Sequence, residues 1–281
     1  MSSTGALSNA GRSSRIHRTH FITLFFLALF TPFAAGIMSF NPAIEEEELV
    51  VISSAREKDM GRKIHKQVLK QFNIPVDPLQ QKRVEEIGRR LALGTDRRDI
   101  VYRFTVINHE KDEMYNAFAA PGGYIYIFDD LVEVMETDDN VAAVLAHEMG
   151  HVEARHSVKG MQANIGLTAL MFVGAQMKSD RGTRASAGKA IGQLMAAYSR
   201  HDERQADELS VKYLRKAGFD PGGAVRSMEV LKRLRKKGPR WRYSVYKSHP
   251  YLSERISYLR KHIKGETDFD SYINLVTDDG F

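Results

Sequence analysis

Residues 137–152 read TDDNVAAVLAHEMGHV, and they hold the most informative pattern in the chain. Thr137, Asp138 and Asp139 suit the start of a helix, where a hydroxyl caps free backbone N–H groups and acids compensate the positive end of the helix dipole. Apolar residues then recur at helical spacing, which is typical of a helix with a buried face. The stretch therefore predicts a core helix that carries the segment HEMGH at residues 147–151.

Two histidines in this segment lie one turn apart on the same helix face. The Cβ atoms of His147 and His151 are expected about 5–6 Å apart, and imidazoles at this spacing can bind one Zn²⁺ at about 2.0–2.1 Å each. Glu148 lies one step round the helix, near such an ion but not directed at it. This position suits a base that takes a proton from zinc-bound water. The pattern predicts one zinc ion per chain.

A catalytic zinc site requires a third protein ligand, and the segment SRHDERQAD at residues 199–207 offers one. Glu203 and Asp207 are one helical turn apart, so one carboxylate can bind the metal while the other accepts the N–H of a ligand imidazole. A solvated, charged helix face would give the same pattern. His156 lies five residues beyond His151, which on a continuous helix turns it away from the pair, so we expect a structural or solvated role.

The rest of the chain is mostly helical, with a small β component. Helical spacing of apolar residues predicts helices over residues 55–72, 79–93, 131–136, 140–160, 200–217, 223–237 and 252–262, and β-rich runs predict strands over 102–107 and 124–128. We therefore expect an α+β fold, predominantly α-helical, with a small β-sheet beside the HEMGH helix. The apolar run 165–177 is too short to cross a bilayer, which favours a buried helix over a membrane-dipping hairpin. Residues 179–188 suit a loop.

Composition excludes several classes of protein. The chain of 281 residues is 43% hydrophobic and 27% charged, as in a folded globular protein. The absence of cysteine excludes disulfide frameworks, thiolate nucleophiles, cysteine-ligated metals and a lipid anchor on cysteine. A formal net charge of +6 is too small to indicate a nucleic-acid partner, and we expect none.

Four motifs, taken in order, resemble those of a known family: NAFAAPGG at 116–123, HEMGH, SRHDERQAD, and SHPYLSERI at 248–256. Across residues 55–263 the chain is similar to the HtpX/BepA-type zinc metallopeptidases, which are CaaX-prenyl-protease-like gluzincins with an HExxH motif. The resemblance implies a gluzincin-like domain in which His147, His151 and Glu203 bind zinc, Glu148 is the catalytic base and Asp207 supports a ligand. Without the clear transmembrane helices or the repeat extension of other members, the chain resembles a short periplasmic-type member.

His249 and Arg255 match the last of these motifs, and several roles stay open for both. Either could stabilise the oxyanion of the tetrahedral intermediate, which makes both candidate catalytic residues. His249 could instead occupy the open zinc position and inhibit the enzyme, or cap the helix that begins after Pro250. Arg255 could instead form an ion pair on the surface of that helix.

Residues 116–128 resemble the substrate-binding edge of the family. An extended peptide often adds as a strand to an exposed sheet edge, so Asn116, Ala117, Tyr124, Ile125 and Tyr126 are expected to bind substrate. An ordinary hairpin strand packed on the HEMGH helix is the alternative.

The segment LKRLRKKGPRWR at 231–242 is strongly basic. A solvated helix end is the simplest interpretation. The alternative is contact of Lys232, Arg233, Arg235, Lys236 and Lys237 with an anionic membrane surface. No motif that reads nucleic acid accompanies these residues.

The first part of the chain has the features of a targeting segment. Residues 1–20 contain three arginines and no acid, and the apolar run 21–30 is followed by a proline and small residues. This favours a signal peptide over an uncleaved membrane anchor, with a mitochondrial transit peptide as a lesser alternative. We expect residues 1–40 to be signal or anchor, 41–265 to form the zinc metallopeptidase domain and 266–281 to form a tail.

The expected protein is a zinc-dependent endopeptidase in which Glu148 activates a zinc-bound water for attack on a peptide bond. The resemblance implies polypeptide substrates among misfolded or misassembled envelope proteins. A zinc-containing chaperone-like protein, or a membrane-surface binding protein with little proteolysis, is the alternative. The expected location is the periplasm or cell envelope, with the mitochondrial inner membrane as the alternative.

Overall fold

A computed structural model describes residues 37–74, 77–109, 113–163, 198–235 and 248–265. Several predictions lie outside these residues. They concern the signal or anchor up to residue 36, the apolar run 165–177, the loop 179–188, Lys236 and Lys237, and the tail 266–281.

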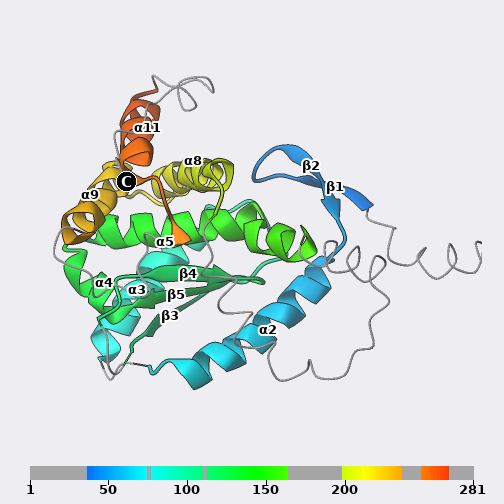
Figure 1. Cartoon of the computed structure of the whole chain (residues 1–281), viewed down its shortest axis with the longest axis horizontal. Helices are drawn as coiled ribbons and strands as arrows, with labels where there is room; N and C mark the ends of the chain where they lie inside the picture. The colour runs from blue at the N-terminus through cyan, green and yellow to red at the C-terminus, as the bar shows by residue number, and fades with distance from the viewer. Residues whose placement is uncertain (1–36, 75–76, 110–112, 164–197, 236–247, 266–281) are drawn as a thin grey trace, which may run out of the picture. The chain divides into compact units, whose positions relative to one another are not determined.

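The HEMGH helix, α5 (Asp138–Glu153), is the centre of the fold. The Thr137 side chain accepts a hydrogen bond from the backbone N–H of Asn140, which caps the helix as the sequence predicts. Almost every residue of α5 from Asn140 onward is buried. The helix packs on the sheet on one side and on α8 (Arg200–Lys216) and α9 (Gly222–Arg235) on the other (Figure 1). A helix buried all round needs the apolar composition seen before HEMGH.

A three-stranded sheet lies beneath α5, in the order β3 (Arg103–Ile107), β5 (Tyr124–Phe128), β4 (Ala117–Ala120). β5 runs parallel to β3 and antiparallel to β4, with Arg103 opposite Tyr124 and Ala117 opposite Ile127. The β4–β5 turn contains Gly122 and Gly123 at φ +78° and +89°, a region that favours glycine. Within the described strands, β4 is an edge strand and lies next to α5.

The central position of β5 corrects one expectation. Its backbone has hydrogen-bonded neighbours on both sides, so it offers no edge to a peptide. The prediction that Tyr124, Ile125 and Tyr126 bind substrate through an added strand is therefore wrong. Ile125 packs in the core shared with α5, and the two tyrosines pack in a second core with α2 (Ser54–Gln71). A strand buried on both faces reads as an unbroken apolar and aromatic run.

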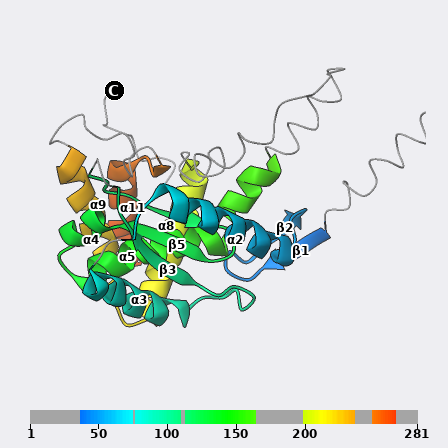
Figure 2. The same cartoon turned by 90° about the horizontal axis from the view of Figure 1, so that it is seen from below.

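The remaining helices are close to their predicted positions. They are α3 (Pro78–Ala92), which packs along β3 (Figure 2), α4 (Asp129–Val134) and α11 (Leu252–Lys264). Asp77 caps α3 ahead of Pro78, and Ser199 and Asp202 form a reciprocal capping box at the start of α8. The α+β, predominantly helical fold is confirmed. No helix in the described ranges is long and apolar enough to span a membrane.

Gly150 brings two helices into direct contact. A Cβ atom at this position would lie 2.8 Å from the carbonyl oxygen of Ala206 on α8, closer than such contacts occur. The glycine of HEMGH therefore lets the backbones of α5 and α8 approach closely. This approach places the acidic residues of α8 opposite the histidines of α5.

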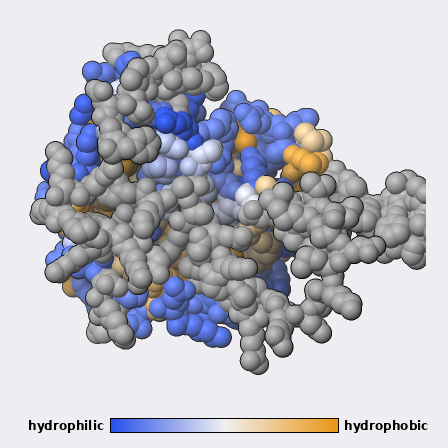
Figure 3. Space-filling model, viewed as in Figure 1, coloured by the Kyte–Doolittle hydropathy of each residue, from blue (hydrophilic) through white to orange (hydrophobic). Residues whose placement is uncertain are grey.

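A two-stranded hairpin that the sequence did not predict precedes α2. It consists of β1 (Ile37–Asn41) and β2 (Glu46–Val50), and most of it belongs to a different compact unit from the helices and the three-stranded sheet. Met38, Phe40 and Leu49 are more than half exposed. Figure 3 shows apolar residues on the surface of the hairpin.

Candidate metal centre

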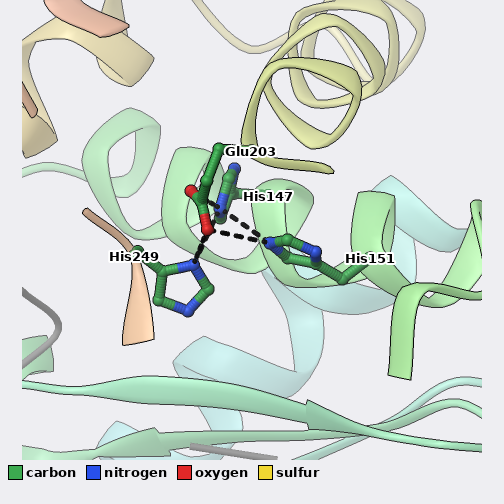
Figure 4. A group of neighbouring side chains, drawn as sticks. All are labelled: His147, His151, Glu203 and His249. Carbon is green, nitrogen blue, oxygen red and sulfur yellow. Dashed lines mark hydrogen bonds and ion pairs between the residues drawn. The ribbon is translucent and has the colours of Figure 1, made fainter. Parts of the chain in front are cut away.

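Four buried side chains converge above the sheet: His147 and His151 from α5, Glu203 from α8, and His249 from the segment before α11 (Figure 4). One ligand atom from each residue lies within 4.8 Å of all the others. In the sequence these residues span more than a hundred positions, and the packing of α8 against both α5 and α11 brings them together.

The spacing of these atoms fits a tetrahedral metal site. His147 Nε2 lies 3.1 Å from His151 Nε2, 3.2 Å from His249 Nδ1 and 3.4 Å from Glu203 Oε2. Glu203 Oε1 lies 3.0 Å from His249 Nδ1 and 3.8 Å from His151 Nε2. Donors placed tetrahedrally at the usual zinc distances are separated by about 3.3 Å, close to these values.

The hydrogen bonds around the two α5 histidines assign their tautomers. His147 Nδ1 lies 3.0 Å from Asp207 Oδ1 and must donate to that carboxylate, which leaves a lone pair on Nε2. His151 Nδ1 lies 2.7 Å from His156 Nδ1, while His156 Nε2 lies 2.9 Å from Gln205 Oε1 and donates to it. His151 Nδ1 is therefore the donor, and its Nε2 also carries a lone pair. Both lone pairs face the Glu203 carboxylate, an arrangement that calls for a cation.

The charges of the site also indicate that it binds a cation. Arg255, only 2% exposed, contacts Glu203 Oε2 at 2.5 Å and donates to both oxygens of Asp207 at 2.7 and 2.9 Å. Burial raises the pKa values of Glu203 and Asp207, but Arg255 and the neighbouring histidines outweigh it, so the pKa of Glu203 lies well below its usual range and that of Asp207 is lowered. Burial and Arg255 lower the pKa of His147, yet hydrogen bonds to Asp207 and Glu203 raise it to about 9, so without a metal ion a proton occupies Nε2, the atom that would bind the metal. The site attracts positive charge, and its donors fit a divalent metal ion.

Glu148 lies beside these four residues but points elsewhere. It is 2% exposed, and its Oε1 lies 3.3 Å from Nε2 of His249. Its Oε2 has no hydrogen-bond partner among the described residues, although it is buried. A buried carboxylate oxygen without a partner is costly unless a ligand uses it. Glu148 is therefore placed as an acceptor for a proton that arrives with a bound molecule.

The profile of peptidase family M48 matches residues 78–263, which is more than half of the chain and includes every residue of this centre. The chain belongs to peptidase family M48. This membership makes it a metalloendopeptidase and confirms the resemblance seen in the four motifs.

Proteins similar to this chain include two bacterial proteases and one mitochondrial protease. Metalloprotease LoiP of Escherichia coli (strain K12) is 30% identical over 205 residues, covering 68% of this chain and 74% of LoiP. The beta-barrel assembly-enhancing protease of that strain is 27% identical over 189 residues, which cover 64% of this chain and 38% of that protein. A mitochondrial metalloendopeptidase of Schizosaccharomyces pombe is 28% identical over 171 residues, which cover 60% of this chain and 50% of that protein. This chain spans half or less of the last two proteins.

The structure excludes two roles left open by the sequence. His249 does not cap α11, because Tyr251 occupies the cap position and no side chain among the described residues forms a capping hydrogen bond there. Arg255 forms no surface ion pair, because it is buried between Glu203 and Asp207. Of the basic residues predicted to face a membrane surface, Lys232 and Arg233 are exposed, and Arg235 is the last residue of α9.

His156 is the residue that the sequence pattern placed wrongly. The spacing argument assumed a continuous helix, but α5 ends at Glu153 and Arg155 has a left-handed φ of 58°. The chain therefore turns, and His156 returns to accept the hydrogen bond of His151. A residue that tolerates positive φ poorly, such as arginine, gives no signal for this turn.

His156 should support the metal through His151. We expect His156→Phe to weaken metal affinity by about 10–100-fold, because the ring is kept but the acceptor for His151 Nδ1–H is lost. His156→Asn, whose Oδ1 can replace Nδ1 as acceptor, should retain most of the affinity. Competition with a chromophoric chelator measures both variants. Wild-type affinity in the phenylalanine variant would contradict this role.

Proposed function

We propose that this protein is a zinc-dependent endopeptidase that hydrolyses misfolded or misassembled proteins of the cell envelope. The main support for this proposal is the set of four donors at tetrahedral spacing with Glu148 beside it. Histidine and carboxylate donors in such a set suit Zn²⁺. The name of one relative links that protein to β-barrel assembly, which supports an envelope role for this chain. The mitochondrial relative supports the mitochondrial inner membrane as the alternative location.

Each residue of the site would have its own role in peptide hydrolysis. Zinc bound by His147, His151 and Glu203 would polarise the peptide carbonyl and make water a better nucleophile. Glu148 would take the proton of the attacking water and pass it to the leaving amine. Asp207 and Arg255 hold His147 and Glu203 in place through the contacts described above.

The substrate backbone would lie along β4. This strand is next to α5, and the side chain of Asn116, the residue before it, accepts a hydrogen bond of 3.4 Å from Oγ of Ser248, which precedes His249 in the chain. We propose that Asn116, Ala117 and the following residues pair with an extended peptide. Asn116 also fixes the strand, since its carbonyl accepts the N–H of Phe128 and its side chain accepts that of Ala117.

Metal removal tests the proposed activity. We expect cleavage of casein to stop when a chelator removes the metal and to return when Zn²⁺ is added, because the donor set needs the cation for its chemistry. Protein gels of timed digests provide the measurement, and addition of Mg²⁺ alone is the control. Casein that stays intact under all conditions, with zinc bound, would favour the chaperone-like or membrane-surface binding protein.

Replacing His249 should either raise or lower the rate of peptide cleavage, and the direction distinguishes its two candidate roles. Its Nδ1 lies among the ligand atoms, in the position that substrate or water would need. We therefore expect His249→Ala to raise peptide cleavage, by about tenfold for each 1.4 kcal/mol by which His249 favours the closed site. Initial rates on a fluorogenic peptide measure the effect. A fall of roughly 10²-fold would show instead that His249 stabilises the transition state.

A further inference from the structure

A buried cluster of charged side chains lies at the C-terminal end of α5, outside the set of metal donors. Glu57 of α2 is 1% exposed, and Arg97 and Arg155 are each 7% exposed. Arg97 donates two hydrogen bonds to the Glu57 carboxylate, at 3.1 and 2.9 Å, and Arg155 Nε lies 3.3 Å from Glu57 Oε2. Asp99 supplies a second acid, with Oδ2 3.1 Å from Arg97 Nη2. Glu57 thus pairs with two buried cations at once.

Arg155 forms the turn that brings His156 back to the metal centre. Its φ of 58° lies in the left-handed region, which a residue with a side chain adopts only when its surroundings hold it there. The side chain provides this hold, because it is paired with Glu57 and its Nη2 donates to the carbonyl of Ile52. The backbone carbonyl of Arg155 accepts the N–H of Lys159, so the next helical turn begins directly from the strained residue.

Arg97 attaches the same carboxylate to the end of α5. Its Nη1 donates to the carbonyl of Val152 at 3.1 Å, one residue after His151. Glu57 is therefore connected to the last turn of α5 through Arg97 and to the residues that follow it through Arg155. The metal ligand His151 lies between these two attachments in the fold.

The cluster lies directly behind the ring of His151. Glu57, Arg155 and His151 border one small cavity of about 10 Å³, which is no larger than the space for one water molecule. The Arg155 turn also sets the place of His156, whose Nδ1 accepts the 2.7 Å hydrogen bond of His151 Nδ1. A shift of this turn would remove the acceptor that orients the ligand ring.

We propose that Glu57 is a positioning residue for the metal centre, acting through Arg155 and His156 on the ligand His151. Glu57 contacts none of the four donors' ligand atoms, so its effect is carried by the turn that it holds. The inference rests on the metal ligands assigned under the proposed function. It does not depend on the substrate or on the cleavage step.

The metal affinity of Glu57→Gln tests this role. Glutamine keeps the size of the side chain but leaves Arg155 without the charge that holds its strained turn. We expect the affinity for Zn²⁺ to fall about tenfold, the lower end of the range for losing an indirect support of a ligand, as measured by competition with a chromophoric chelator. Adding Arg155→Gly to this variant should restore most of the affinity, because glycine adopts the left-handed turn without support and Arg97 keeps Asp99 as its partner.

Two further variants separate positioning from general stability. Val68→Ala, on the same helix and 0% exposed, should lower the unfolding temperature of the metal-free protein without changing its affinity for Zn²⁺. Arg155→Val leaves the pair of Glu57 and Arg97 intact but disfavours the left-handed turn, so it should lose about as much affinity as Glu57→Gln. This variant tests the same link from its other end if Glu57→Gln does not fold.

The outcomes distinguish this inference from the peptidase function. Wild-type affinity in Glu57→Gln or in Arg155→Val, no recovery with Arg155→Gly, or an equal loss in Val68→Ala would overturn the positioning role and leave the peptidase function intact. The expected pattern of Zn²⁺ affinities in a protein that cleaves no peptide would overturn the peptidase function and leave the role of Glu57 intact.

Discussion

Replacing Glu148 with glutamine should lower peptide cleavage by about 10²–10⁴-fold while the metal stays bound. The side chain keeps its size, and none of the four donors is changed, but the amide oxygen is a poor proton acceptor. Glu203 and Asp207, the other acids of the site, are already engaged by Arg255 and His147, so neither is placed to replace Glu148.

Two measurements on the same protein check this result. Metal content by mass spectrometry should equal that of the wild type, and initial rates on a fluorogenic peptide should show the loss. A variant that keeps more than half of the wild-type rate would rule out Glu148 as the base. A variant that loses its metal would instead show that Glu148 helps to hold the ion.

Removing Glu203 should have the largest effect on the metal itself. We expect Glu203→Ala to weaken metal affinity by well over about 100-fold, because a direct donor is lost and Arg255 is left without one of its two acidic partners. Asp207→Ala should weaken it by about 10–100-fold, since His147 keeps its lone pair but loses the acceptor that orients its ring.

Glu208 is the matched control for these two changes. It lies on the same helix, but its carboxylate accepts hydrogen bonds from Arg204 and Tyr258 and does not reach the donor set. Metal content after dialysis of the three alanine variants compares them directly, and Glu208→Ala should match the wild type. Full metal content in Glu203→Ala, with loss in another variant, would show that the ligand has been assigned to the wrong residue.

Most of the fold could be predicted because its helices carry local signals. Apolar spacing gave the positions of α2, α3 and α8 to within one or two residues, and the Thr137 cap marked the start of α5. The strand order could not be predicted in this way. The run YIYIF is compatible with an edge or a centre, and only the pairing of β5 with both β3 and β4 decides between them.

The site residues, like the fold, could be predicted where the signal lies within one helix, and could not where it depends on a turn or on packing between helices. His147, Glu148 and His151 are fixed by one helix, and Glu203 and Asp207 by another, so their spacing could be read directly. His156 could not be placed, because a turn at Arg155 interrupts the periodicity on which the argument depended. The contact of Arg255 with both Glu203 and Asp207 also depends on the tertiary packing of α11 against α8.

The close contact at Gly150 implies that this centre cannot be transplanted as a motif. The donors of α5 and α8 hold their spacing because two backbones meet where a side chain would keep them apart. A scaffold that received HEMGH on one helix and the glutamate on another would need the same crossing, with a glycine at its nearest point. The middle residues of the motif are therefore part of its geometry, and a designer who treated them as spacers would obtain two histidines without a third donor.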